Sequence, residues 1–293
     1  MSHLETRAPR SDGEIAAVEA LLDRADAARG EPALDRERFA RVHRSAAAVW
    51  DGDRPVAFAQ AERTPRRWEV EVVVEPGRRG EAAEVGGPAL AAIVDRVRSA
   101  GGGQAYLWVS RPGDADDRMA RAAGFSPDRD LWQMVRPLPT GLPYELDTRP
   151  FVVGKDEAPW VEVNNRAFDW HPEQGGWTVA DVLAREAEPW FDAGGFLLHE
   201  REGRLAGFCW TKVHDRHDPP QGEIYVIAVD PDFMGLGLGQ ALTLAGLDHL
   251  ARDGLTVGML YVDAGNTPAV RLYEGLGFTV DHIDRAYAAE IVA

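Results

Sequence analysis

The residues best suited to chemistry form a glycine-rich loop near the middle of the second half of the chain. Gly235, Gly237 and Gly239 alternate with Leu236 and Leu238, after an apolar strand pattern and before a helical one. Glycine adopts backbone conformations closed to other residues, so successive N–H groups can converge on an anion. The start of the following helix adds partial positive charge. The loop therefore predicts a diphosphate site, and it is not a P-loop because no Lys-Ser/Thr pair follows the glycines.

A carboxylate begins the strand that leads into this loop. Glu223 opens the pattern at 223–229. An alkylammonium must lose a proton before its nitrogen can attack a carbonyl, and a positioned carboxylate can take that proton directly or through water. Backbone N–H groups of Ile227, Ala228 and Val229 can stabilise the negative charge that develops. Glu223 is therefore a candidate base for a reaction that needs a neutral amine, the alternative being a solvated charge at the strand edge.

Two halves with the same order of elements must position these residues. The first half predicts a helix at 12–29, strands at 46–51, 55–62 and 70–74, a helix at 87–100, a strand at 105–110 and a helix at 118–123. The second half predicts helices at 157–168 and 178–186, strands at 195–200, 204–213 and 223–229, a helix at 239–252, a strand at 257–262, a helix at 268–276 and a strand at 286–292. Prolines concentrated at 136–143 mark the join. We expect an N-terminal domain at 1–137, a linker at 138–146 and a C-terminal domain at 147–293.

The composition of the 293 residues argues against several classes of function. A net charge of −16 disfavours nucleic-acid binding, and the excess acid is either a solvated surface or the lining of a site for a cationic amine. Cys209 is the one cysteine, and its apolar neighbours favour a core thiol over a nucleophile. The chain shows no signal sequence and no run of about 18 apolar residues. We expect a cytoplasmic monomer that contacts neither membrane nor nucleic acid, and the scattered histidines predict no metal site.

With the downstream segment 266–278, which carries Asn266, Ala269, Tyr273 and Gly277-Phe278, the chain resembles the GCN5-related N-acetyltransferase superfamily. The resemblance implies an α/β fold of two tandem acyl-CoA N-acyltransferase domains, each a mixed, mostly antiparallel twisted sheet flanked by helices. It also implies acetyl-CoA as cosubstrate, with its pyrophosphate at the glycine loop. Met234 and Leu236 replace the superfamily's polar or basic residues, which leaves the backbone donors in place but points to a reduced affinity. The implied acetyl-CoA contacts are Ile227, Ala228, Val229, Met234, Gly235, Leu236, Gly237, Leu238, Gly239, Gln240, Asn266, Thr267, Pro268, Ala269, Val270 and Arg271.

The corresponding loop of the first half is degenerate. Its second glycine is displaced, and Glu81 and Glu84 bring negative charge near the expected phosphates. We therefore expect the N-terminal domain to be inactive and mainly structural. Residual contacts with coenzyme A would come from Val72, Val73, Val74, Arg79 and Gly80.

The segments 164–177, 210–214, 222–226 and 260–263 further resemble one branch of the superfamily, over nearly the whole chain. In that branch the acetyl group passes to the cysteinyl amine of a cysteine–glucosamine–inositol pseudodisaccharide, a small amino-sugar thiol. The resemblance implies substrate contacts at Asp35, Glu173, Lys212, Glu223 and Tyr261. Asp35 also has the character of a helix cap.

Several roles stay open at this point. The general acid for the leaving thiolate is Tyr273, at the superfamily's usual position, or Tyr287, on the last strand and slightly preferred. The alternative for either tyrosine is a packed aromatic side chain without a catalytic role. His171 either contacts the ligand or stabilises its loop, and the segment 214–218 is expected to be a solvated loop. The alternative functions are N-acetyl transfer to another small amine, such as an aminoglycoside or a peptide, and non-catalytic binding of acyl-CoA.

Overall fold

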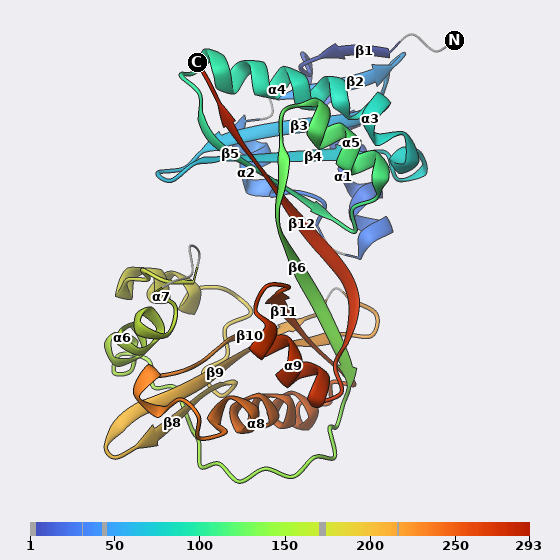
Figure 1. The fold of residues 1–293 in the computed structure, drawn as a ribbon. Helices are drawn as coiled ribbons and strands as arrows, with labels where there is room; N and C mark the ends of the chain where they lie inside the picture. Colours follow the sequence, from blue (N-terminus) through green and yellow to red (C-terminus); the bar gives the residue numbers. More distant parts are fainter. Residues whose placement is uncertain (1–3, 31, 43–45, 170–173, 216) are drawn as a thin grey trace. The chain divides into compact units, whose positions relative to one another are not determined.

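The computed structural model describes residues 4–30, 32–42, 46–169, 174–215 and 217–293. These residues form two compact units, each a β-sheet with helices packed against it (Figure 1). The first unit comprises Met1–Trp132, Asp263–Gly265 and His282–Ala293. The second comprises Gln133–Val262 and Asn266–Asp281.

The sheet of the first unit has the strand order β1-β2-β3-β4-β5-β12. Its strands are β1 (Leu4–Arg7), β2 (Ala47–Asp51), β3 (Arg54–Arg63), β4 (Trp68–Val74), β5 (Gly103–Ser110) and β12 (Thr279–Ile291). Neighbouring strands are antiparallel except β4 and β5, whose parallel pairing runs from Trp68 to Val70. The last strand of the chain thus closes this sheet, with Asp284 opposite Ser110.

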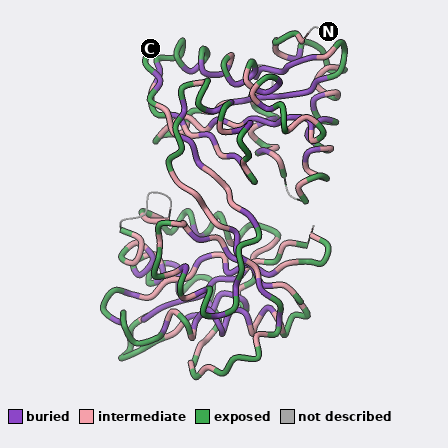
Figure 2. The backbone as a smooth tube through the Cα atoms, turned by 45° about the vertical axis from the view of Figure 1, so that its right-hand side comes forward, coloured by how far each residue is buried: buried purple, intermediate pink, exposed green. Residues whose placement is uncertain are grey.

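Successive strand residues point to opposite sides of this sheet, and both faces carry apolar side chains that pack against helices. Ala48, Trp50 and Phe58 pack with α1 (Asp12–Arg29) and α2 (Arg36–Val42). Ala47 and Val49 face the other core, with residues of α3 (Ala82–Val85), α4 (Gly87–Ser99) and α5 (Asp114–Ala122). The short 3-10 helix η2 (Pro76–Glu81) precedes α3. Figure 2 shows the buried residues following the strands and the helix faces turned towards them.

The sheet of the second unit has the strand order β6-β11-β10-β9-β8-β7. Its strands are β6 (Ser126–Pro137), β7 (Arg149–Pro150), β8 (Phe196–Arg201), β9 (Arg204–His214), β10 (Gln221–Val229) and β11 (Val257–Asp263). The pairs β7–β8, β8–β9 and β9–β10 are antiparallel, and β10–β11 is parallel. This parallel pair sits in the middle of the unit and frames the site described below.

One face of this sheet carries an aromatic core under α6 (Glu157–Ala167) and α7 (Val179–Glu186). Phe196 stacks on Trp210 with ring centres 4.3 Å apart, and Trp160 meets Trp210 edge-on at 5.8 Å. Burial of such side chains stabilises the fold by roughly 1.5–3 kcal/mol each. The remaining elements of the unit are η3 (Pro231–Phe233), α8 (Leu238–Arg252) and α9 (Thr267–Gly275).

The opposite face is covered by α8, which glycines allow to approach closely. A Cβ added at Gly246 would lie 2.5 Å from Cys209 Sγ, and one at Gly207 would lie 2.8 Å from Leu242. Cys209 is fully buried and its burial raises the pKa of the thiol, so it stays protonated. The prediction of a core thiol is confirmed.

The predicted helices and strands are all present, but the pairing of the last strands was not foreseen. No ranges were predicted for β1, α3, β6 and β7, α2 was indicated only by Asp35 as a helix cap, and β12 begins at Thr279 rather than near residue 286. The expected C-terminal domain runs to residue 293, whereas the structure groups His282–Ala293 with the first unit because β12 pairs with β5. Gln133–Pro137, expected in the N-terminal domain, groups with the second unit. Among the described residues, the helices are all too short or too polar to cross a membrane.

Candidate active site

In the second unit the glycine loop connects η3 to α8. Gly235 and Gly237 have φ of +78° and +76°, and Gly237 is the N-cap of α8. A Cβ at Gly235, Gly237 or Gly239 would meet nothing within 4 Å, so the space beside the loop is open. The first amides of a helix have no acceptor within it, and Ala241 N is the donor that reaches back to Gly237 O, at 3.2 Å. The loop thus presents N–H groups at a positive helix end, as the sequence indicated, and it fits a diphosphate.

The apolar side chains at the start of this loop turn outward. Met234 is 70% exposed and Leu236 is 51% exposed, whereas Leu238, the first residue of α8, is buried. The two departures from the superfamily pattern therefore leave the main-chain donors unobstructed.

Halfway along β10 the strand separates from β11. Within the described residues, its pairing with β11 covers Gln221 to Ile224, opposite residues 257–260. A β-bulge at Tyr225 then shifts the register with β9 between Ile224 and Val226. Ile227, Ala228 and Val229 pair with β9 and are half-buried. The edge of β10 that faces β11 is therefore open to a ligand over these residues, and bulges commonly mark such places.

Glu223 lies before the bulge, next to two basic side chains of β9. Lys212 is directly opposite Glu223 in the register. His214 lies on the same face, with its Nε2 2.7 Å from Oε2 of Glu223. The side chain of Glu223 is 8% exposed and that of His214 is 27% exposed. Glu223 is thus a buried, paired carboxylate rather than a solvated edge charge, and the expectation of a solvated loop at 214–218 is wrong for His214.

Aromatic rings surround the ammonium group of Lys212. Its Nζ lies 4.6 Å from the ring centre of Trp190 and 5.3 Å from that of Tyr225. Trp190 and Tyr225 meet edge-on at 5.1 Å. Burial raises the pKa of the Tyr225 hydroxyl, so it stays protonated. A cation beside flat apolar faces and a hydroxyl suits a ring that carries hydroxyl groups.

Tyr261 lies on β11, and the segment that follows this strand leads into α9. The hydroxyl of Tyr261 accepts a hydrogen bond from Gln133 Nε2 at 2.8 Å. Asn266 caps α9 by accepting from Ala269 N at 3.3 Å, and Pro268 lies in the first turn. Thr267 and Arg271 are exposed on this helix. The segment therefore presents its start to solvent, as a contact with the cofactor would require.

The two candidate acids lie in different units. Tyr273 is on α9 in the second unit, is 7% exposed and meets Phe278 edge-on; burial raises the pKa of its hydroxyl. Tyr287 is fully buried in the core of the first unit, where its hydroxyl donates to Asp117 Oδ1 at 2.6 Å. Burial, together with Asp117, raises the pKa of Tyr287. The Tyr287 hydroxyl therefore has a hydrogen-bond partner within the first unit. Its position does not support the prediction that Tyr287, rather than Tyr273, is the general acid.

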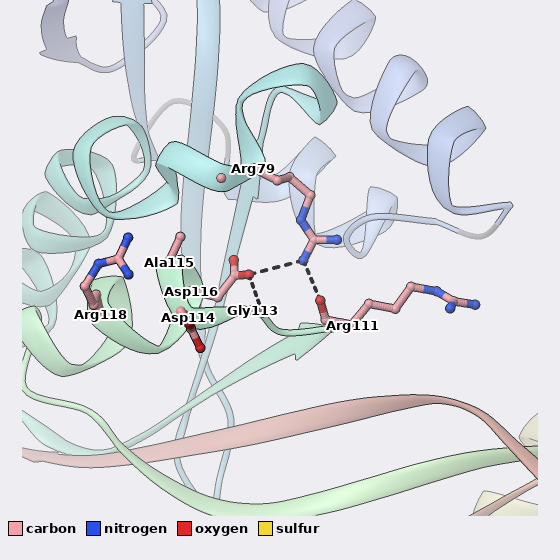
Figure 3. A pocket seen from close by; sticks show the side chains of 8 residues that line it. Arg79, Arg111, Gly113, Asp114, Ala115, Asp116 and Arg118 are labelled. Atoms are coloured by element: carbon pink, nitrogen blue, oxygen red, sulfur yellow. Dashed lines mark hydrogen bonds and ion pairs between the residues drawn. The ribbon is translucent and has the colours of Figure 1, made fainter.

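The first unit lacks the glycine turn. In its place stands η2, and within this described segment neither Gly77 nor Gly80 has a positive φ. Arg79 lines a cavity of about 490 Å³ and points to Asp116 and the main chain of Arg111 (Figure 3). Its Nη2 lies 2.9 Å from Ser110 O, 3.2 Å from Arg111 O and 3.4 Å from Asp116 Oδ2. The guanidinium is thus shared among three oxygens of its own unit.

The strand end of the first unit is also less open than that of the second. Val72, Val73 and Val74 are buried, whereas their counterparts on β10 are half-buried. The register between β3 and β4 runs without a bulge from Val74 to Trp68. The two copies therefore differ in turn, bulge and burial.

Three further predicted positions need separate mention. Asp35 is exposed and its Oδ1 accepts from Arg38 N at 2.8 Å, so it does cap α2. Glu173 and His171 lie outside the described residues. Asp192 and Asp253 each bring a carboxylate oxygen to 3.3 Å from His249 Nε2, a grouping that could hold a cation.

Three neighbours of the predicted site residues were not predicted from the sequence. They are His214, beside Glu223; Trp190, beside Lys212; and Gln133, beside Tyr261. His214 could have been found from the alternation along 210–214, which places Trp210, Lys212 and His214 on one face of a strand. Trp190 and Gln133 carry no such signal, because their contacts depend on tertiary packing.

Comparison with known proteins places these features in a family. Residues 160–278 match the model of the Acetyltransferase (GNAT) family. A protein of Thermobispora bispora named mycothiol acetyltransferase is 48% identical over 82% of this chain and 81% of its own. A second of that name, from Acidimicrobium ferrooxidans, is 41% identical over 91% of each chain. A tandem GNAT protein from the clavulanic acid biosynthesis pathway has the same fold, with a TM-score of 0.69, 18% identity and 99% of each chain covered.

Proposed function

Because this chain belongs to the mycothiol acetyltransferases, within the GNAT family of acetyltransferases, we propose that it acetylates the cysteinyl amine of desacetylmycothiol to form mycothiol. Desacetylmycothiol is the cysteine–glucosamine–inositol acceptor expected from the sequence, and acetyl-CoA is the donor. The observation that carries the proposal is the layout of β10. The glycine loop follows the open stretch of β10, and Glu223 precedes it, beside Lys212 and His214 of β9.

The layout fits acetyl-CoA in length as well as in charge. Val229 lies six residue steps beyond Glu223, which at ~3.3 Å per step is roughly 20 Å of strand. An extended pantetheine arm spans a distance of that order. We propose that the amides from Met234 to Gln240 bind the diphosphate, that residues 227–229 hold the arm by main-chain hydrogen bonds, and that residues 266–271 contact its other side.

When bound, acetyl-CoA supplies the thioester carbonyl that the amine attacks. Glu223 takes the proton of the cysteinyl ammonium, directly or through one water, and so frees the nitrogen lone pair. The burial of Glu223 and its contact with Nε2 of His214 at 2.7 Å support this role, since a paired carboxylate keeps a fixed orientation. Main-chain N–H groups on the open edge stabilise the oxygen that gains charge.

Tyr273 is the acid in this scheme. It holds the superfamily's usual position for this group and lies in the same unit as Glu223, and burial raises the pKa of its hydroxyl, which is therefore protonated before the thiolate departs. Lys212 and Tyr261 would bind hydroxyl groups of the acceptor, and Asp35 and Glu173 remain proposed contacts from the family resemblance. We also propose that the first unit is non-catalytic, because its turn is helical and its Arg79 is already shared among oxygens.

The test uses the full-length chain with acetyl-CoA and desacetylmycothiol, with the product followed by mass spectrometry. The proposal expects acetylation on nitrogen, and we expect Glu223→Gln to lower kcat by about 100-fold or more. A panel of aminoglycosides and peptides serves as the comparison. Faster turnover of one of these would replace the acceptor, and tight acetyl-CoA binding without turnover of any amine would favour a binding module.

We further propose that the enzyme works as a cytoplasmic monomer, without a metal, membrane or nucleic acid. Sedimentation equilibrium of the active enzyme measures its mass in solution. Activity that falls on dialysis against EDTA and returns with a divalent cation would overturn the metal-free part, and Asp192, His249 and Asp253 would then be the first residues to substitute.

A further inference from the structure

We propose that His214 is a positioning residue for Glu223, and that its hydrogen bond holds the carboxylate in the orientation that accepts the amine proton. The proposal deepens the acetyl transfer proposed above and rests on it. His214 is the last residue of β9, and it had no predicted role of its own.

The register of the sheet explains how the two side chains meet. Gln221 of β10 lies opposite His214, and Glu223 lies opposite Lys212. His214 and Glu223 are therefore diagonal neighbours on one face, a separation that long side chains bridge. The contact between Nε2 and Oε2 is 2.7 Å, short enough for a charge-assisted hydrogen bond.

The chemistry of the base fixes the direction of this bond. A carboxylate that accepts a proton is ionised and can only accept hydrogen bonds, so Nε2 of His214 must carry the donated hydrogen. That bond occupies Oε2 and leaves Oε1 as the proton acceptor. Because Glu223 is 8% exposed, water offers few competing donors and the imidazole sets the orientation.

The step balances without any other reactant. The ammonium proton moves to Oε1 of Glu223, and the nitrogen lone pair forms the new C–N bond with the acetyl carbon. The C–S bond breaks and the thiolate takes the proton of Tyr273, and the second proton that the nitrogen loses on becoming an amide returns through water to the tyrosine oxygen. His214 keeps its hydrogen throughout, which distinguishes a positioning residue from a catalytic one.

The surroundings of His214 allow a selective test. His217 is its aromatic neighbour, with ring centres 5.9 Å apart, and no role is assigned to His217. Among the described residues, the polar groups near Glu223 on this face also include Gln221, Lys212 and Tyr225. Substitution of His217 therefore serves as a control for a change of the same residue type beside the site.

The experiment compares two replacements of His214 in the full-length enzyme. In His214→Gln, the amide nitrogen can reach Oε2 as a donor; in His214→Phe, a ring of similar shape has no donor. We expect His214→Phe to lower kcat by about 10- to 100-fold, the value of one hydrogen bond to a charged group, with KM for acetyl-CoA unchanged. His214→Gln should restore most of that loss, and His217→Phe should behave like the wild type.

A double-mutant cycle separates positioning from general support of the fold. If His214 acts through Glu223, then His214→Phe adds nothing to the loss already caused by Glu223→Gln. Equal losses in both backgrounds would overturn the proposal, as would full activity of His214→Phe. If desacetylmycothiol is not the acceptor, the same variants are assayed with the amine that is turned over, which keeps the two proposals separable.

A spectroscopic measurement needs no acceptor at all. The imidazole Nε2–H of His214 should give a proton NMR signal protected from exchange with water in the wild type. Glu223→Ala should abolish that signal while His217→Phe leaves it. A signal that survives Glu223→Ala, or one absent from the wild type, would show that the pair does not form as proposed.

Discussion

The proposed acetyl-CoA site can be tested by a substitution that changes only the backbone conformation preferred at one glycine of the loop. Gly237 has a φ of +76° and is exposed, and a Cβ added there would meet nothing within 4 Å. Side-chain clashes are thus absent, and the cost of Gly237→Ala is that of a left-handed backbone for an L-residue, about 1–2 kcal/mol. If the loop relaxes away from this conformation when empty, that energy is required on binding and weakens acetyl-CoA by about 5- to 30-fold.

Asparagine supplies the matched comparison, because it tolerates the left-handed region better than alanine although it is larger. We expect acetyl-CoA to bind most tightly to the wild type, then to Gly237→Asn, and least to Gly237→Ala. Isothermal titration calorimetry gives the three dissociation constants, and kcat at saturating acetyl-CoA should change little. An order in which alanine binds better than asparagine would mean that side-chain size, not backbone conformation, governs the loop.

Three further outcomes are expected. In Gly246→Ala, the added Cβ lies 2.5 Å from Cys209 Sγ, and overpacking costs about 1–3 kcal/mol against the ~1 kcal/mol gained in helix propensity. The urea midpoint of unfolding should therefore fall. A rise in this midpoint would refute the close packing of α8 on the sheet. Tyr273→Phe should lower kcat by about 100-fold or more, whereas Tyr287→Phe should lower the melting temperature and leave kcat within about two-fold; the reverse pattern would restore Tyr287 as the acid. The Arg149 guanidinium holds the pKa of Asp156 below its ordinary 3.8, so this ion pair stabilises the fold above that pH, and the stabilisation is lost as pH falls through the lower pKa of the folded state. The urea midpoint of Arg149→Gln should therefore decline less steeply below about pH 4 than that of the wild type. Parallel declines of the two midpoints with pH would contradict this prediction.

What the sequence predicted well was encoded locally. The glycine spacing, the strand before it and the helix after it depend on neighbouring residues, and each was found where expected. Cys209 lay within an apolar run, which was enough to predict its burial. Asp35 was expected to cap a helix from its residue type alone, and it does.

The rest depended on contacts between distant segments. The bulge at Tyr225 arises from the pairing of β10 with β9, and a single strand pattern does not reveal it. Tyr287 looked like an acid on a final strand of the second half, but strand pairing carries it into the other core. His214 was hidden because its loop-like neighbours, rather than its strand position, dominated the interpretation.

The pairing of β12 with β5 has a consequence for how the protein is made. On a ribosome, residues 1–132 emerge long before His282–Ala293, so one edge of β5 stays unpaired until residues 282–293 have been synthesised. Its core lacks Tyr287 and Ile291 during that interval. Expression of the first half alone would leave the same edge exposed and prone to association with other chains. Removal of residues 282–293 should therefore destabilise the first unit, most of which is synthesised before them.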